Sequence, residues 1–85
     1  MARRLYVGNL SFNTTEDALR DAFSAFGKLK YVKILLDRET GKSRGFGFVE
    51  FLNDAECAVA MNTMNGADLD GRKLKVNEAH EREKR

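Results

Sequence analysis

The sequence predicts an α+β fold, a ferredoxin-like β-α-β-β-α-β sandwich in which a four-stranded antiparallel sheet carries two helices on one face. The first observation behind this prediction is the order of patterns, because strand-like and helix-like apolar spacings follow one another in that sequence. The second is size, since 85 residues with 42% hydrophobic content suit one small domain with one core. The third is that aromatic and charged residues share one side of a predicted strand, which indicates a sheet face left open to solvent.

The first predicted strand covers residues 5–10, and a helix is predicted over residues 15–25. Thr14 is the expected N-cap of this helix, and Gly27 is expected to end it in a left-handed conformation. Phe12 interrupts the polar connection before the helix, and we expect its ring to lie under the edge of the sheet. Apolar residues recur in the helix at helical spacing, at Leu19, Ala22, Phe23 and Phe26.

The second and third predicted strands are residues 31–36 and 44–51, joined by a polar, charged loop. Alternation in the second strand places Lys33 and Leu35 on one face. The opposite, buried face of that strand is expected to consist of Val32, Ile34 and Leu36.

A second helix is predicted over residues 54–64, with Asn53 as its N-cap. Asp70-Gly71 predicts a tight turn, and residues 73–77 form the fourth predicted strand. The packing stripe of the helix is expected to consist of Ala55, Ala58, Val59 and Met61. In the last strand Leu74 and Val76 are expected to point inward, and the outward residues are Lys73, Lys75 and Asn77.

The third strand is the most informative segment. Its alternation places Gly45, Gly47, Val49 and Phe51 on one face and Arg44, Phe46, Phe48 and Glu50 on the other. A core face would not accommodate two charged residues, so Phe46 and Phe48 are predicted to face water. The ferredoxin-like order places the first and third strands side by side, which adds Tyr6 as a third ring. Exposed neighbouring rings favour stacking of unpaired bases over the alternative, ordinary core packing.

Charge is distributed unevenly along the chain. The net charge is +2, but the two predicted helices carry −4 and the remainder carries +6. A basic sheet side opposite acidic helices would steer a polyanion toward the sheet. The alternative is that the charges only provide solubility.

Residues 44–51, RGFGFVEF, match K/R-G-F/Y-G/A-F-V-x-F/Y at every position, and residues 5–10 resemble the hexapeptide that accompanies this octapeptide. On these motifs the chain resembles the RNA recognition motif family. The resemblance covers residues 4–79 as one domain and leaves residues 80–85 as a charged tail, either frayed or a short helical extension. The chain looks like the small single-domain bacterial members and is similar to the domain of glycine-rich RNA-binding proteins.

The resemblance implies a role for each matching residue. Tyr6 and Phe48 correspond to rings that each stack on a base, Phe46 to a ring that packs between sugars or on a neighbouring base, and Arg44 to a phosphate ligand. The positions that correspond to main-chain readers of base edges are Asn77, Glu78 and Ala79. Outward-pointing cations that either contact phosphate or are merely solvated are Arg4, Lys33, Lys73 and Lys75.

The expected function is therefore salt-sensitive binding of two to four nucleotides of single-stranded RNA, with weaker binding of single-stranded DNA, in post-transcriptional regulation. The alternative is a protein-interaction module on the same scaffold. We expect no enzymatic activity, cofactor or metal, because no nucleophile–base pair, paired carboxylates or metal-ligand spacing is present. The expected protein is a monomer in the cytoplasm, or the nucleus if eukaryotic, since Cys57 is the single cysteine and no signal peptide or apolar run of about 20 residues is visible.

Overall fold

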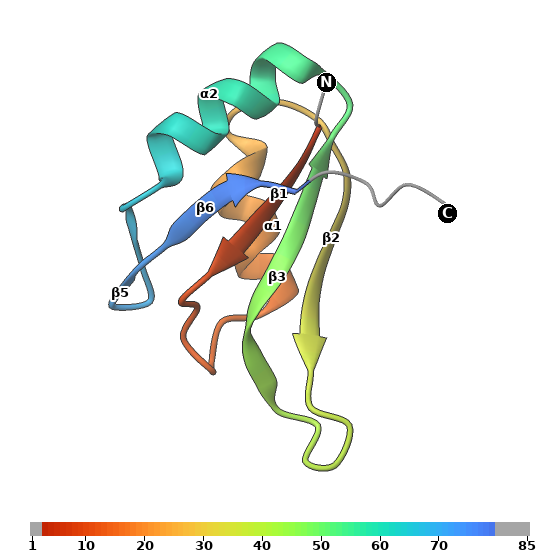
Figure 1. The fold of residues 1–85 in the computed structure, drawn as a ribbon, viewed down its shortest axis with the longest axis vertical. Coiled ribbons are helices and arrows are strands. Elements are labelled where there is room, and N and C mark those ends of the chain that lie inside the picture. The colour runs from red at the N-terminus through yellow and green to blue at the C-terminus, as the bar shows by residue number, and fades with distance from the viewer. Residues whose placement is uncertain (1–2, 80–85) are drawn as a thin grey trace.

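The computed structural model of the chain describes residues 3–79 and contains the predicted order of elements, with one additional short hairpin (Figure 1). The elements are β1 (Arg4–Gly8), α1 (Glu16–Ser24), β2 (Leu29–Leu36), β3 (Ser43–Phe51), α2 (Asp54–Met64), β4 (Asp68–Leu69), β5 (Arg72–Lys73) and β6 (Lys75–Glu78). One antiparallel sheet has the spatial order β2-β3-β1-β6, so β1 and β3 are central, as predicted. The ferredoxin-like fold class is confirmed, and the predicted tail, residues 80–85, lies outside the described residues.

The core lies between the helices and one face of the sheet. α1 contacts β2, α2 contacts β1, β3 and β6, and in Figure 1 the ribbon of α1 passes behind the strands. Every second residue of the central strands faces this layer and is fully or almost fully buried, namely Leu5, Val7, Val49 and Phe51. The helices contribute Leu19, Phe23, Cys57 and Ala60. Burial of this apolar area is the main force that holds the sheet and helices together.

The N-cap of α2 is the predicted residue, whereas the N-cap of α1 is not. Asn53 caps α2 as predicted, accepting a hydrogen bond from the backbone N–H of Glu56 at 3.0 Å. The N-cap of α1 is Thr15, not Thr14, and its hydroxyl accepts from Ala18 N–H at 3.1 Å. Thr14 is instead buried, and its hydroxyl donates to Asp70 at 2.6 Å, which ties the start of α1 to the turn between β4 and β5.

Gly27 does not end α1 in a left-handed conformation. The helix ends at Ser24, and Gly27 lies two residues beyond the C-cap Ala25 with a φ of 154°, far from the left-handed helical value. A Cβ atom at this position would collide with the carboxylate of Glu56 on α2. The positive φ, which residues with a side chain rarely adopt, together with the approach of Glu56 therefore explains the glycine.

The packing stripe of α2 contains Met61, as predicted, but not Ala55, Ala58 or Val59, which are exposed. The stripe consists of Cys57, Ala60, Met61 and Met64, which is i, i+3, i+4, i+7 spacing. Val59, predicted to be buried, is 54% exposed. Small apolar residues occur on several sides of this helix, so two stripes fit the sequence and only contact with the sheet selects one.

Burial, followed by the charges of Glu78 and Asp54, raises the pKa of the Cys57 thiol, which therefore stays protonated and unreactive.

Two apolar residues predicted to be covered are exposed. Phe12 is 71% exposed, because Leu10 fills the core position and donates its N–H to Gly45 O at 2.9 Å. Leu36 is 56% exposed, because the pairing of β2 with β3 shifts register between Ile34 and Leu36. The shift turns Leu36 out of the alternation that buries its neighbours.

The predicted fourth strand is divided into two pieces. Asp70 and Gly71 form the predicted tight turn with φ values of 53° and 84°, which joins β4 to β5 as a small hairpin. Only residues from Lys75 onward pair with β1, so Lys73 belongs to the hairpin and not to the main sheet. Asn9 holds the hairpin against the end of β1, donating to Lys73 O at 2.6 Å and accepting from the guanidinium of Arg72 at 2.6 Å.

Candidate nucleic-acid interface

Three aromatic rings lie on the sheet face opposite the helices. Tyr6 pairs with Phe48 in the β1–β3 register, while the intervening residues Val7 and Val49 face the core. Phe46 lies two residues before Phe48 and therefore shares its face. All three rings are partly exposed, so the predicted orientation toward solvent is present in the structure.

The three rings form one cluster, which we call the ring face, with no parallel stacking within it. The ring centroids are 5.7 Å apart for Tyr6 and Phe46, 6.1 Å for Tyr6 and Phe48, and 6.3 Å for Phe46 and Phe48. The interplanar angles are 35°, 65° and 89° in the same order. Tilted and edge contacts hold the rings in place, and no ring has a whole face covered by another ring. Such faces are available to flat ligands.

Gly8 provides the space that the Tyr6 ring occupies. It is two residues after Tyr6 and shares its side of β1, and a Cβ atom there would lie 2.8 Å from Tyr6 Cε2 and Cζ. The glycine thus allows the tyrosine ring to lie down along the strand.

Two guanidinium groups lie over rings of the cluster. Arg4 Cζ is 5.8 Å from the Phe48 ring centroid, and Arg44 Cζ is 5.7 Å from that of Phe46. Both distances are within the range of cation–π attraction. This attraction keeps positive charge beside the rings, where the phosphate of a stacked nucleotide would need it.

The outer strands add polar and cationic side chains to the same face. Lys33 on β2 pairs with Phe48, while on β6 Asn77 pairs with Tyr6 and Lys75 with Gly8. All three of these outer-strand side chains are exposed. The structure therefore brings eight of the predicted site residues to one surface, namely Arg4, Tyr6, Lys33, Phe46, Phe48, Lys75 and Asn77, and Arg44 at its end.

The remaining three predicted residues are placed differently. Lys73 lies on the hairpin, with its Nζ 3.6 Å from Asp68. Glu78 pairs with Leu5, whose side chain faces the core, so its own side chain points to the helix side of the sheet. The N–H of Ala79 donates to Arg4 O at 2.8 Å, so this main-chain donor is engaged within the protein.

Glu50 is the acidic residue on the predicted open face, and its charge is countered by neighbours. It pairs with Arg4 on one side and Tyr31 on the other, and its carboxylate is 4.0 Å from Lys30 Nζ. The side chain is only 16% exposed. A nearby cation and low exposure reduce the repulsion that this carboxylate would exert on a phosphate.

Sequence reasoning missed Tyr31, a fourth aromatic residue on this face. It pairs with Glu50 and is 38% exposed. The signal was present, because Tyr31 precedes the predicted face residue Lys33 by two positions and must share its side of the strand. Lys30 was missed because the register shift between Leu29 and Tyr31 brings it toward Glu50, and a single strand pattern does not reveal such a shift.

The two glycines of β3 are required for different reasons, one by the neighbouring strand and one by its own backbone conformation. A Cβ atom at Gly47 would collide with the carbonyl oxygen of Lys33 on β2, so close approach of the neighbouring strand requires this glycine. Gly45 has a φ of 90°, which favours glycine, and a Cβ there would lie 3.4 Å from the ring of Phe12.

Within residues 3–79 there is no group of three or more His, Cys, Asp and Glu side chains that could hold a metal ion. Neither helix in that range is long and apolar enough to cross a membrane.

Comparison with known proteins decides the family. A model of the RNA recognition motif matches residues 5–75, which is most of the chain. The chain belongs to the RNA recognition motif family. The octapeptide over residues 44–51 lies on β3, and the hexapeptide begins on β1 and extends past its end to Leu10.

Relatives of this RNA recognition motif chain include "Glycine-rich RNA-binding protein 1" of Mycosarcoma maydis, 52% identical over 96% of this chain and 47% of that protein. "Putative RNA-binding protein RbpB" of Nostoc sp. (strain PCC 7120) is 51% identical over 95% of this chain and 79% of that protein. The chain spans about half the length of the first curated relatives it matches. Among solved structures, the Rna15 RRM with bound RNA (GU) has a TM-score of 0.86 and 31% identity over 95% of this chain and 86% of that one.

Proposed function

We propose that this chain binds single-stranded RNA by stacking bases on the ring face. The observation that carries the proposal is the cluster of Tyr6, Phe46 and Phe48 on the face opposite the helices, with Arg4 and Arg44 beside the rings. Stacking uses the ring faces, and the cations supply the charge that a ribose-phosphate chain requires. The RNA-bound Rna15 domain, similar in fold and sequence, supports the proposal.

The expected affinity follows from the number of platforms. Stacking contributes about 1–3 kcal/mol per base, so two or three rings offer roughly 3–8 kcal/mol. Micromolar binding requires about 8 kcal/mol, so stacking alone falls short and phosphate contacts supply the remainder. Binding of two to four nucleotides is therefore expected to be moderate and to weaken as salt rises.

Single-stranded RNA is the preferred form of ligand in this proposal. A duplex has its bases already stacked and their faces hidden, so it is expected to bind poorly. Single-stranded DNA offers the same base faces without the 2′-hydroxyl and is expected to bind more weakly. We propose that the protein acts as a monomer on transcripts after their synthesis, and crosslinking in cells with sequencing of bound RNA would identify those transcripts.

The direct test is titration of short labelled RNA single strands with the wild type, Tyr6→Ala and Phe48→Ala. Each substitution removes one platform and is expected to weaken binding at least about tenfold while the protein stays folded. Val59→Ala is a control for truncation of an exposed apolar side chain, because Val59 is exposed on α2 and is not part of the ring face. Wild-type affinity in both folded ring variants would refute the proposal.

A protein-interaction module is the second candidate, and exposed apolar residues favour it. Phe12 and Leu36 are exposed near the end of the β2–β3 hairpin and are not members of the ring face. The test is a pulldown after nuclease treatment. A protein partner that Tyr6→Ala and Phe48→Ala still bind, and that Phe12→Ser no longer binds, would support this function. Loss of the partner on nuclease treatment would mean that RNA bridges the two proteins.

A further inference from the structure

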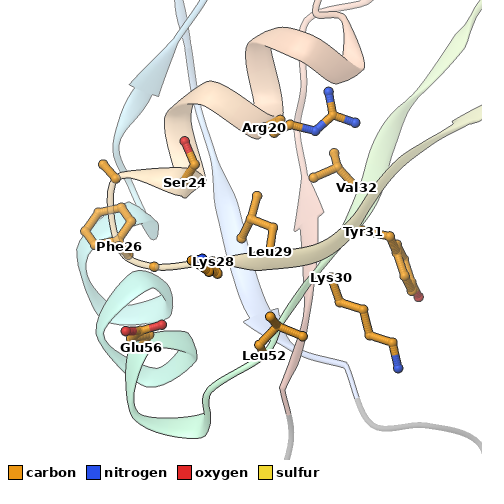
Figure 2. A pocket seen from close by; sticks show the side chains of 12 residues that line it. Arg20, Ser24, Phe26, Lys28, Leu29, Lys30, Tyr31, Val32, Leu52 and Glu56 are labelled. Atoms are coloured by element: carbon orange, nitrogen blue, oxygen red, sulfur yellow. The ribbon is translucent and has the colours of Figure 1, made fainter.

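A groove lies at the outer edge of β2 (Figure 2). It has a volume of about 830 Å³, in the range of small-molecule binding sites. Its walls come from the end of α1, the first residues of β2 and the segment that follows β3. In Figure 2 Arg20 extends over one end of the groove and Leu52 lies at the other.

The lining of the groove is cationic with an apolar part. Its charged residues are Arg20, Lys28, Lys30 and a single acid, Glu56. Leu52 is 53% exposed within it, although it is a large apolar residue. Arg20 is paired with Asp17 at 2.8 Å and Lys30 lies 4.0 Å from Glu50, so Lys28 is the cation of the lining best placed to meet a phosphate. Leu52 donates its N–H to Lys28 O at 3.1 Å, so a cation and an exposed apolar surface are adjacent, which fits a ligand with phosphates and flat apolar faces.

Tyr31 makes the groove continuous with the ring face. It belongs to both surfaces, since it pairs with Glu50 on the open face and also lines the groove. Phe48 pairs with Lys33, so Tyr31 is the diagonal cross-strand neighbour of Phe48, about 7–8 Å away by strand geometry. Figure 2 shows the side chains of Tyr31 and Lys30 both directed away from α1. A chain of nucleotides that leaves Phe48 over β2 meets Tyr31 next.

We propose that single-stranded RNA bound on the ring face continues across Tyr31 into this groove, where a further base packs on Leu52 and its phosphate lies near Lys28. The inference rests on the proposed function and extends the site by an additional nucleotide subsite at the edge of the sheet. Continuity with the ring face through Tyr31, and the placement of Lys28 next to the exposed Leu52, favour RNA as the occupant.

An extended peptide pairing with the edge of β2 is less well supported. The backbone N–H of Ile34 points away from β3 and already donates to the Glu16 carboxylate at 3.0 Å. An added strand would have to displace this side chain to pair along β2.

The test compares two RNA lengths in one groove variant. Tetrauridylate covers the ring face, and octauridylate can also reach the groove. The variant Lys28→Ser/Leu52→Ser changes two exposed side chains that are not on the ring face. A matched control, Lys42→Ser/Val59→Ser, removes one exposed lysine and one similarly exposed apolar residue outside the groove. The measured quantity is the ratio of the two dissociation constants, tetrauridylate over octauridylate.

The longer RNA has more binding registers, but this statistical advantage is the same for every variant. We expect the ratio of the groove variant to be at least about fivefold lower than that of the wild type and of the control, with tetrauridylate affinity unchanged. An equal ratio in the groove variant and the wild type would overturn the inference and leave a protein as the remaining occupant. A similar loss in the control would also overturn it, as a general charge effect. Failure of wild type to bind either RNA would contradict the proposed function itself.

Discussion

The two faces of the central strands use similar residues for different purposes. On the helix side of β1 and β3, Leu5, Val7 and Val49 are 0% exposed. On the other side Tyr6 and Phe48 alternate with them along the same strands and remain partly exposed. The difference is what lies opposite, since helices cover the first set and no element of the described chain covers the second.

An apolar side chain stabilises the fold only to the extent that the fold covers it. The core face contributes its apolar area to stability on folding. The ring face retains part of its apolar area, with Arg4 and Arg44 held over its rings by cation–π attraction. That remaining area becomes useful when a ligand covers it. Substitutions on the two faces should therefore separate stability from binding.

Gly47→Ala is expected to have a larger effect than the two substitutions that follow, Gly8→Ala and Lys33→Ser. The new methyl group would collide with the backbone carbonyl of Lys33 and lie 3.0 Å from Ile34 Cα, so the pairing of β2 and β3 must shift. Stability should fall by about 1–3 kcal/mol or more, as measured by urea unfolding. A variant as stable as the wild type would show that these strands pair less closely than described.

Gly8→Ala adds the same methyl group under the ring face. It would lie 2.8 Å from the Tyr6 ring, which is free to swing outward, whereas a strand backbone is not. Gly8 does not have a positive φ, so its backbone conformation is open to alanine. The free energy of unfolding is therefore expected to change by less than about 1 kcal/mol. Affinity for short single-stranded RNA should fall roughly fivefold, because the platform is displaced. Fluorescence titration together with urea unfolding distinguishes the two quantities, and a stability loss without an affinity loss would reverse the assignment.

Lys33→Ser tests the smallest effect, a single phosphate contact beside Phe48. The slope of log affinity against log salt should become shallower by about 0.7. Lys73→Ser is the comparison, and we expect a smaller change because Lys73 lies on the hairpin next to Asp68. Titrations at several salt concentrations give both slopes. Equal slopes for Lys33→Ser and wild type would remove Lys33 from the interface.

The sequence was sufficient to predict the element order and the ring face. Arg44 and Glu50 flank the two phenylalanines of β3 on the same side, and no core would accept those charges without partners. Short-range alternation carries this information, so the orientation of Tyr6, Phe46 and Phe48 could be predicted before the structure.

Other features depend on contacts between elements that a single segment does not encode. The outward turn of Leu36 follows from a register shift between two paired strands. The burial of Cys57 in place of Val59 follows from the side of α2 that meets the sheet. The predicted cap, Thr14, is instead hydrogen-bonded to Asp70, which is distant in the sequence, and Thr15 caps α1.

The candidate site was predicted less completely than the fold. Lys73 and Lys75 alternate as if on one strand, but the break between β5 and β6 places Lys73 on the hairpin. Glu78 was assigned with Asn77 for its main-chain groups; its side chain points to the opposite face, and the main-chain role stays a prediction. The position of Tyr31 on the open face could have been predicted from alternation along its strand. The groove that Tyr31 lines could not, because it forms where α1, β2 and the segment after β3 come together in space.

The most direct measurement compares Phe48→Ala with Phe51→Ala, two identical substitutions on opposite faces of β3. Phe51 is 1% exposed in the core, so its loss should lower the free energy of unfolding by about 3–5 kcal/mol while the folded fraction keeps near wild-type affinity for short single-stranded RNA. Phe48→Ala should cost clearly less stability and weaken RNA binding at least about tenfold. Wild-type RNA affinity in Phe48→Ala, together with a stability loss as large as that of Phe51→Ala, would contradict the separation of the two faces.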